Sequence, residues 1–192
     1  TRNRIFAFSN LAALINYAAT FGISFVLSLY LQNVKGMSPS DAGFFLMIQP
    51  SVMALVGSVS GSLSDRIDSR ILSSAGMAII VIGLLMLARL HTESSAPYMV
   101  ISLIILGFGF GMFSSPNTNS VMSSVEKKYL GIASATLGTM RATGQMFSMA
   151  IAAMAINVYI GAADINAGNT DSFMKAQSVI FLIFAVLCFL GV

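Results

Sequence analysis

The chain has 192 residues, of which 56% are hydrophobic and only 9% are charged, with a formal net charge of +3 and a mean hydropathy of +0.85. A soluble domain carries about 25% charged residues, so this chain lacks the polar side chains that would cover a soluble fold. The lipid bilayer must cover it instead. The Lys and Arg residues are dispersed singly and in pairs without forming a basic face, which excludes nucleic acid as a partner.

Reactive side chains are scarce. Cys188 is the single cysteine, which excludes an intrachain disulfide and a cysteine-based metal cluster. His91 has no second histidine or cysteine to complete a metal site. The sequence contains no HExxH or GxSxG motif and no pair of carboxylates within an apolar stretch, so we expect no enzyme, no cofactor and no bound metal.

Six stretches are long and apolar enough to cross a membrane, which takes about 20 residues for roughly 30 Å of hydrocarbon. Lipid offers no partner to an unpaired backbone amide, so each span must be helical and the predicted fold class is an all-α polytopic membrane protein. One bundle over residues 1–192 would contain spans at approximately 5–31, 40–63, 71–90, 98–121, 131–160 and 172–192. The chain starts without a methionine and stops inside an apolar run, so we expect it to be part of a longer polypeptide.

The basic residues in the short loops predict the orientation, because such residues are enriched on the cytoplasmic side. Counting alternate sides gives six on the side of the N-terminus against three on the other. The six are Arg2, Arg4, Arg66, Arg70, Lys127 and Lys128, and the three are Lys35, Arg89 and Lys175. We therefore expect an integral protein of the cytoplasmic membrane whose N-terminus is cytoplasmic.

The second span shows a start signal and an irregularity. Ser38 is placed to cap its helix, with Pro39 at the first helical position and Asp41 three residues after the cap. Gln49 and Pro50 lie about a third of the way along the span, and a proline there leaves a carbonyl unpaired. The pattern is that of a hinge or of a tolerated kink.

The turn after this span, "GSLSDRIDSR", resembles the loop signature G-x-x-x-D-R-x-G-R-[KR] of the major facilitator superfamily. Gly61, Asp65, Arg66 and Arg70 match it, whereas Asp68 stands in place of the family's second glycine and Ser69 in place of its arginine. Such a degraded copy is typical of the second half of these transporters. The resemblance implies a latch that holds one conformation at the cytoplasmic surface, and the alternative is a tight turn that only sets topology.

The resemblance continues along the chain. "LSLYLQNVKGMSPSDAG", "LGFGFGMFSSPNTNSVM" and "GIASATLGTMRATGQMFSMAIA" look like successive segments in the second half of the fourteen-helix drug:proton antiporters. It implies the C-terminal half of a carrier, made of two inverted three-helix repeats, whose N-terminal half is the missing partner. In this family the first and fourth helices of a half line the central cavity. The expected substrate pathway is Asn16, Tyr17, Thr20, Ser24, Phe113 and Asn117.

Arg141 is a charge near the middle of the fifth span. Such a charge costs about 2.5–3.5 kcal/mol on insertion scales, so its side chain should face protein or a water-filled cavity. The chain has no acidic residue near the middle of a span to pair with it. Arg141 has one of two roles. It acts in a conformational change or in the substrate pathway, or it belongs to a fixed structural ion pair.

Taken with the resemblance, these features predict part of a secondary transporter that exports drug-like or amphiphilic molecules by alternating access. Proton-coupled antiport needs a titrating group inside the membrane. No Asp, Glu or His lies near the middle of a span, so the acceptor would belong to the missing half. The alternatives are a facilitator or symporter that imports a metabolite or an anion, and a membrane scaffold that transports nothing.

Overall fold

The computed structural model describes residues 2–64, 66–161, 165 and 168–191, with side chains described from Arg4 onward. The elements are α1 (Arg2–Leu29), the π-helical turn η1 (Tyr30–Val34), α2 (Pro39–Leu46), α3 (Ile48–Leu63), α4 (Ser69–Ala88), α5 (Ala96–Ser123), the short 3₁₀ turn η2 (Lys127–Tyr129), α6 (Leu130–Ile160) and α7 (Thr170–Leu190). Six helical segments among the described residues are long and apolar enough to cross a membrane. The prediction of an all-α chain with six spans is confirmed.

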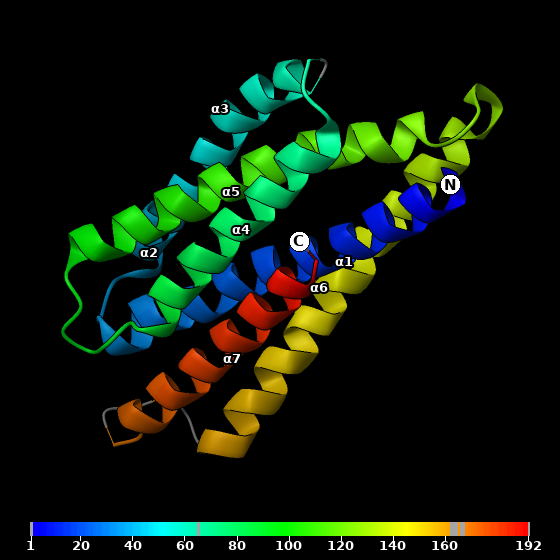
Figure 1. Ribbon diagram of the computed structural model, residues 1–192. Helices are drawn as coiled ribbons and strands as arrows, with labels where there is room; N and C mark the ends of the chain where they lie inside the picture. The colour runs from blue at the N-terminus through cyan, green and yellow to red at the C-terminus, as the bar shows by residue number, and fades with distance from the viewer. Residues whose placement is uncertain (1, 65, 162–164, 166–167, 192) are drawn as a thin grey trace.

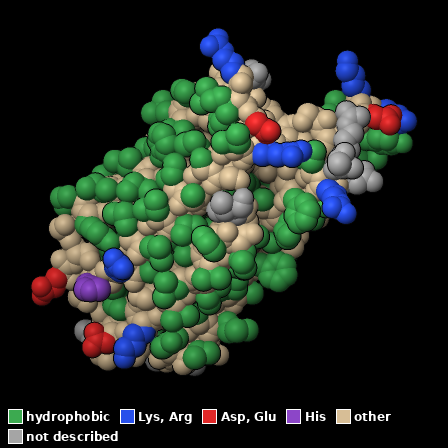
Figure 2. All heavy atoms as spheres, viewed as in Figure 1, with side chains coloured by type: hydrophobic (Ala, Val, Ile, Leu, Met, Phe, Trp, Pro, Cys, Tyr) green, Lys and Arg blue, Asp and Glu red, His purple; other side chains and the backbone are tan. Residues whose placement is uncertain are grey.

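The spans run side by side in one bundle (Figure 1), in which the N-terminus and the α3–α4 and α5–α6 turns share one end. The α4–α5 turn lies at the opposite end. Helix α1 packs against α6, α3 against α5, and α4 against both α5 and α7. Figure 2 shows the charged side chains at the two ends and an apolar band between them, which is the surface that a bilayer covers.

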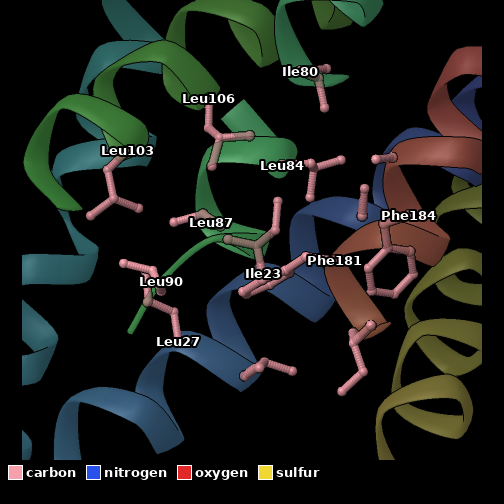
Figure 3. Packing of buried hydrophobic residues seen from close by; sticks show 14 of the residues in the cluster. Ile23, Leu27, Ile80, Leu84, Leu87, Leu90, Leu103, Leu106, Phe181 and Phe184 are labelled. Carbon is pink, nitrogen blue, oxygen red and sulfur yellow. The ribbon is translucent and has the colours of Figure 1, made fainter. Parts of the chain in front are cut away.

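The main core lies where α1, α4, α5 and α7 meet. Figure 3 shows Ile23 and Leu27 of α1 together with leucines of α4 and α5 and with Phe181 and Phe184 of α7. A smaller cluster joins α1, α5 and α6 near the N-terminal end of α1 and consists of Ala13, Val121, Ala133 and Leu137. The two clusters hold α1 against α4, α5, α6 and α7.

The alternating glycines of α5 allow two helices to approach it closely. An ideal Cβ placed on Gly107 would lie 2.6 Å from the Gln49 carbonyl oxygen of α3, and Gly111 meets the same helix one turn later. Between them, Gly109 faces α4, where an added Cβ would lie 2.9 Å from the Gly76 carbonyl oxygen. Glycine is required at these positions because a side chain would overlap a neighbouring backbone.

The second span has a one-residue interruption at Met47, shortly before its proline. Pro50 clashes with a carbonyl four residues earlier, and α2 ends at that residue, Leu46, with α3 beginning again after Met47. The predicted cap at the start of α2 is confirmed. Ser38 Oγ accepts from the Asp41 backbone N–H at 3.2 Å and donates to the Asp41 carboxylate at 2.7 Å.

The far end of α1 is tied to the α4–α5 turn. Lys35, which follows η1, donates to the carbonyl oxygens of Thr92 and Ser94 at 2.7 and 2.8 Å. The Tyr30 hydroxyl donates to the His91 carbonyl oxygen at 2.8 Å. Lys35 therefore has a structural role. This role explains why one of the three basic residues lies at the end opposite the N-terminus.

Candidate functional site

One face of α1 remains open at the middle of the bundle. Tyr17, Thr20 and Ser24 are partly exposed on it, and Phe21 is 42% exposed. The Thr20 hydroxyl donates to the Asn16 carbonyl oxygen at 2.9 Å, and the Ser24 hydroxyl donates to that of Thr20 at 3.2 Å. Both hydroxyl protons are thus used inside the helix, so these oxygens face the opening as hydrogen-bond acceptors.

Asn16 does not share this face. It is 1% exposed, and its Nδ2 points toward α4, where it lies 3.9 Å from Met77 Sδ. Successive residues of a helix are rotated by about 100°, so the neighbour of Tyr17 in sequence is directed into the packed core. The polarity of Asn16 alone could not show whether its side chain points into the core or toward the open face.

Arg141 of α6 reaches the open face and meets Tyr17. Its Nη2 donates to the Tyr17 hydroxyl at 3.0 Å, and its Cζ lies 4.7 Å from the centre of the Tyr17 ring. The guanidinium is therefore both hydrogen-bonded to the tyrosine and stacked on it. The rest of the Arg141 side chain is exposed.

Phe113 and Asn117 of α5 lie elsewhere. They line a cavity of about 410 Å³ near the N-terminal end of α1, together with Arg4 and Arg70. Asn117 donates to the Ser9 carbonyl oxygen at 3.2 Å, and both side chains are almost wholly buried. The six residues of the predicted pathway thus divide into the open face (Tyr17, Thr20, Ser24), the core (Asn16) and this cavity (Phe113, Asn117).

The turn between α3 and α4 contains the predicted latch. Asp65 lies outside the described residues, and Arg66 and Arg70 are exposed. Asp68, which replaces the family's glycine, caps α4 by accepting from the Arg70 backbone N–H at 2.9 Å. This capping role was missed by the sequence analysis, although an Asp directly before a helical pattern is its usual signal.

The turn is also held against α5 by polar contacts. Asn119 Nδ2 donates to Ser64 Oγ at 2.8 Å, and Ser64 Oγ donates to the Gly61 carbonyl oxygen at 2.7 Å. A Cβ on Gly61 would lie 2.8 Å from Ser115 Oγ. The first glycine of the signature thus brings the end of α3 close to a hydroxyl of α5.

The predicted hinge residues lie at the break between α2 and α3. Gln49 is 3% exposed and its carbonyl oxygen lies against Gly107, whereas the Pro50 ring is exposed. A groove of about 570 Å³ begins at Pro50 and runs between α3 and α5. Its polar lining comprises Ser58, Ser114, Ser115, Thr118 and Asn119. The run "FSSPNTNS" in α5 was the signal for this groove, but the sequence analysis used only its Phe113 and Asn117 and none of its hydroxyl groups.

Carboxylates and metal ligands do not gather at this site. No three side chains of His, Cys, Asp or Glu in the described ranges lie close enough together to hold a metal ion. Within the same ranges, the ion pair that forms is Lys128 with Glu126 at 3.0 Å, at one end of the bundle. The arrangement therefore offers hydrogen-bond acceptors, aromatic faces and one guanidinium.

Comparison with known sequences identifies a family and two groups of transporters. The chain matches the profile of the Major Facilitator Superfamily over residues 10–192. The riboflavin transporter RibZ of Clostridioides difficile (strain 630) is 29% identical over 194 residues, which cover 99% of this chain and 42% of that protein. The multidrug resistance protein Stp of Mycobacterium tuberculosis (strain ATCC 25618 / H37Rv) is 29% identical over 146 residues, which cover 76% of this chain and 27% of that protein.

Solved structures share the fold. A structure of a proton dependent oligopeptide transporter superposes with a TM-score of 0.83 at 17% identity, covering 100% of this chain and 40% of that one. This likeness supports the fold alone. The chain spans less than half the length of these relatives, in agreement with the prediction that its six helices make up half of a major facilitator fold.

Proposed function

Because the chain belongs to the Major Facilitator Superfamily, we propose that it is the C-terminal half of a secondary transporter that exports drug-like or amphiphilic small molecules by alternating access. The open face of α1 is the observation that carries this proposal. A polar and aromatic surface at mid-membrane is costly against lipid. It is suited to a pathway between this half and an N-terminal half of the same transporter.

The chemistry of the open face favours ligands with apolar bodies and hydrogen-bond donors. Thr20 and Ser24 present acceptor oxygens, while Tyr17 and Phe21 present rings. Hydroxyl groups along the α3–α5 groove provide a second polar surface. Such adaptable, weakly specific contacts are suited to several substrates better than to one.

Two segments would move during transport: the interruption in the second span and the turn between α3 and α4. Gln49 and Pro50 would act as the hinge of the second span, where the Gln49 carbonyl oxygen lies close to Gly107 of α5. The turn containing Gly61, Asp65, Arg66 and Arg70 would hold one conformation at the cytoplasmic surface. The excess of basic residues at this end supports a cytoplasmic N-terminus in the cytoplasmic membrane.

Proton coupling would depend on the N-terminal half. The acidic side chains that the structure describes are Asp41, Asp68, Glu93, Glu126 and Asp171, and all of them lie at helix ends or in turns. A carboxylate that changes its exposure inside the membrane would therefore be contributed by the other half. Antiport against protons is the form of coupling that we propose.

The proposal is tested by dye efflux from cells that express the full-length transporter and lack their own major exporters. We expect energised cells to exclude the cationic dye ethidium, and a protonophore to abolish the exclusion. Thr20→Val should reduce the efflux rate several-fold, whereas Thr136→Val, at a hydroxyl of α6 that also donates to its own helix, should not. Equal dye accumulation with and without the transporter would contradict the proposal and favour a scaffold.

Uptake of a metabolite or an anion is the second candidate, and Arg141 favours it. Its guanidinium is exposed on the chain and has no described carboxylate as a partner. Accumulation of an anionic dye in expressing cells, without exclusion of ethidium, would favour this candidate over export.

A further inference from the structure

We infer that Arg141, held by Tyr17, is a receptor for a carboxylate inside the membrane. The inference rests on the proposed function, because the carboxylate has to come from a transported substrate or from the rest of the transporter. A guanidinium has five N–H donors, and the structure assigns one bond of Arg141, the 3.0 Å contact with the Tyr17 hydroxyl. Donors therefore remain for an oxyanion.

The position of the pair within the two spans favours a counter-charge for Arg141. Arg141 follows the start of α6 at Leu130 by 11 residues, which is about 16 Å at 1.5 Å per residue. Tyr17 follows Arg4, the start of the first span, by 13 residues, or about 20 Å. Both residues therefore lie in the interior of their spans, where an uncompensated charge is costly.

No carboxylate of the described residues supplies this counter-charge. The five described acidic residues lie at helix ends or in turns, and Glu126 is paired with Lys128. Asp65 and Asp164 are outside the described residues and lie in sequence between helices. The partner of Arg141 is therefore expected to come from outside this bundle.

The pair is mounted on a rigid base. One turn after Arg141, a Cβ added to Gly144 would lie 2.5 Å from the Leu14 carbonyl oxygen of α1 and 3.3 Å from Tyr17 Cβ. The two backbones are therefore in contact beside the pair, and the Tyr17 ring holds the guanidinium in place. A fixed, planar donor group favours bidentate binding of a carboxylate.

The residues around Arg141 indicate that the carboxylate belongs to another part of the transporter or to a substrate. Gly138 and Ala142, exposed on either side of Arg141 in the sequence, are small residues that permit close approach of another surface. Bulky apolar residues such as Phe147, Met154 and Val158 are exposed further along α6. A helix that presents small residues beside its charge is suited to a protein neighbour or a substrate path.

The test measures transport by the full-length protein in everted membrane vesicles, with ethidium as the cationic probe and carboxyfluorescein as the anionic probe. We expect R141Q to lower the initial rate of at least one probe by tenfold or more at an equal protein level. R141K, which keeps the charge, should remain within threefold of the wild type. The matched control R89Q removes an exposed arginine at the end of α4 and should remain within twofold.

The two sources of the carboxylate give different patterns. If the substrate supplies it, R141Q should raise KM for carboxyfluorescein and leave ethidium unaffected. If an acidic side chain of the other half supplies it, both probes should be affected equally. An acid-to-amide change at that side chain should then restore transport in R141Q.

The inference is overturned if R141Q and R141K behave alike, whether both are active, both inactive or both absent from the membrane. If the wild type moves neither probe, the proposed function fails and the melting temperature of the purified transporter decides the inference. A lower melting temperature for R141Q than for R141K, or a rise with carboxyfluorescein in the wild type but not in R141Q, supports it. No difference in either measurement overturns it.

Discussion

Helices α5 and α6 are both long and rich in small residues, but they use those residues differently. In α5, Gly107 and Gly111 face α3 and Gly109 faces α4, each with a neighbouring backbone within 3 Å of an added Cβ. In α6, Gly144 meets α1 in the same way, whereas Gly138 has no neighbour within 4 Å. Helix α5 is therefore an internal packing axis, and the side of α6 around Gly138 has no neighbour among the described residues.

The difference between α5 and α6 separates residues that fold this bundle from residues that would contact a second surface. Small residues that already contact a neighbour hold this bundle together, and their replacement should destabilise the half itself. Small residues on the open side of α6 contribute nothing to the bundle and would matter only where a second surface approaches. Substitutions at matched positions can test this separation.

The largest effect is expected for Gly109→Leu. Its side chain would enter the α4–α5 interface, where a Cβ alone already lies 2.9 Å from the Gly76 carbonyl oxygen and 2.8 Å from Ile80 Cγ1. Overpacking of this kind costs about 3 kcal/mol at the upper end of its usual range. The melting temperature and the membrane level of the transporter should both fall sharply. Phe108→Leu, at the adjacent exposed position, is the control and should retain a normal level.

A smaller and more discriminating effect is expected within α6. Gly144→Ala places a Cβ 2.5 Å from the Leu14 carbonyl oxygen and should cost about 1–2 kcal/mol. Gly138→Ala introduces the same methyl group on the same helix where nothing is near, and should change stability by less than about 0.5 kcal/mol. Thermal unfolding of the two variants in detergent measures the difference. Equal losses would mean that the two sides of α6 do not differ.

The fold was largely predictable from the sequence because a bilayer imposes few choices. Runs of about 20 apolar residues have to be helices, and Ser38 and Pro50 mark a cap and a break by local chemistry that needs no tertiary information. The sequence did not predict that Gly107 of α5 contacts α3 and that Gly109 contacts α4. The contacts of each glycine depend on where the neighbouring helices lie, and the sequence of α5 does not contain that information.

The site was predictable only in part for the same reason. Arg141 was identifiable because a charge in a span is rare, but its stacking on Tyr17 joins residues 124 positions apart. Asn16 and Tyr17 both carry a polar group, and only the packing of α1 directs one into the core and the other to the opening. The hydroxyl groove between α3 and α5 likewise depends on the register of two helices.

A smaller loss than that of Gly144→Ala is expected for Ser60→Ala, which asks whether hydrogen bonds or close packing hold α3 on α5. Ser60 Oγ donates to the Gly111 carbonyl oxygen across the interface at 2.7 Å, and it is buried. Interhelical hydrogen bonds in membranes average about 0.6 kcal/mol, so the melting temperature should fall only slightly. Ser58→Ala is the matched control, because this exposed hydroxyl donates within its own helix at 3.0 Å. A loss for Ser60→Ala as large as that for Gly109→Leu would show that polar contacts rather than glycine packing dominate around α5, and the contrast with α6 would then need a different explanation.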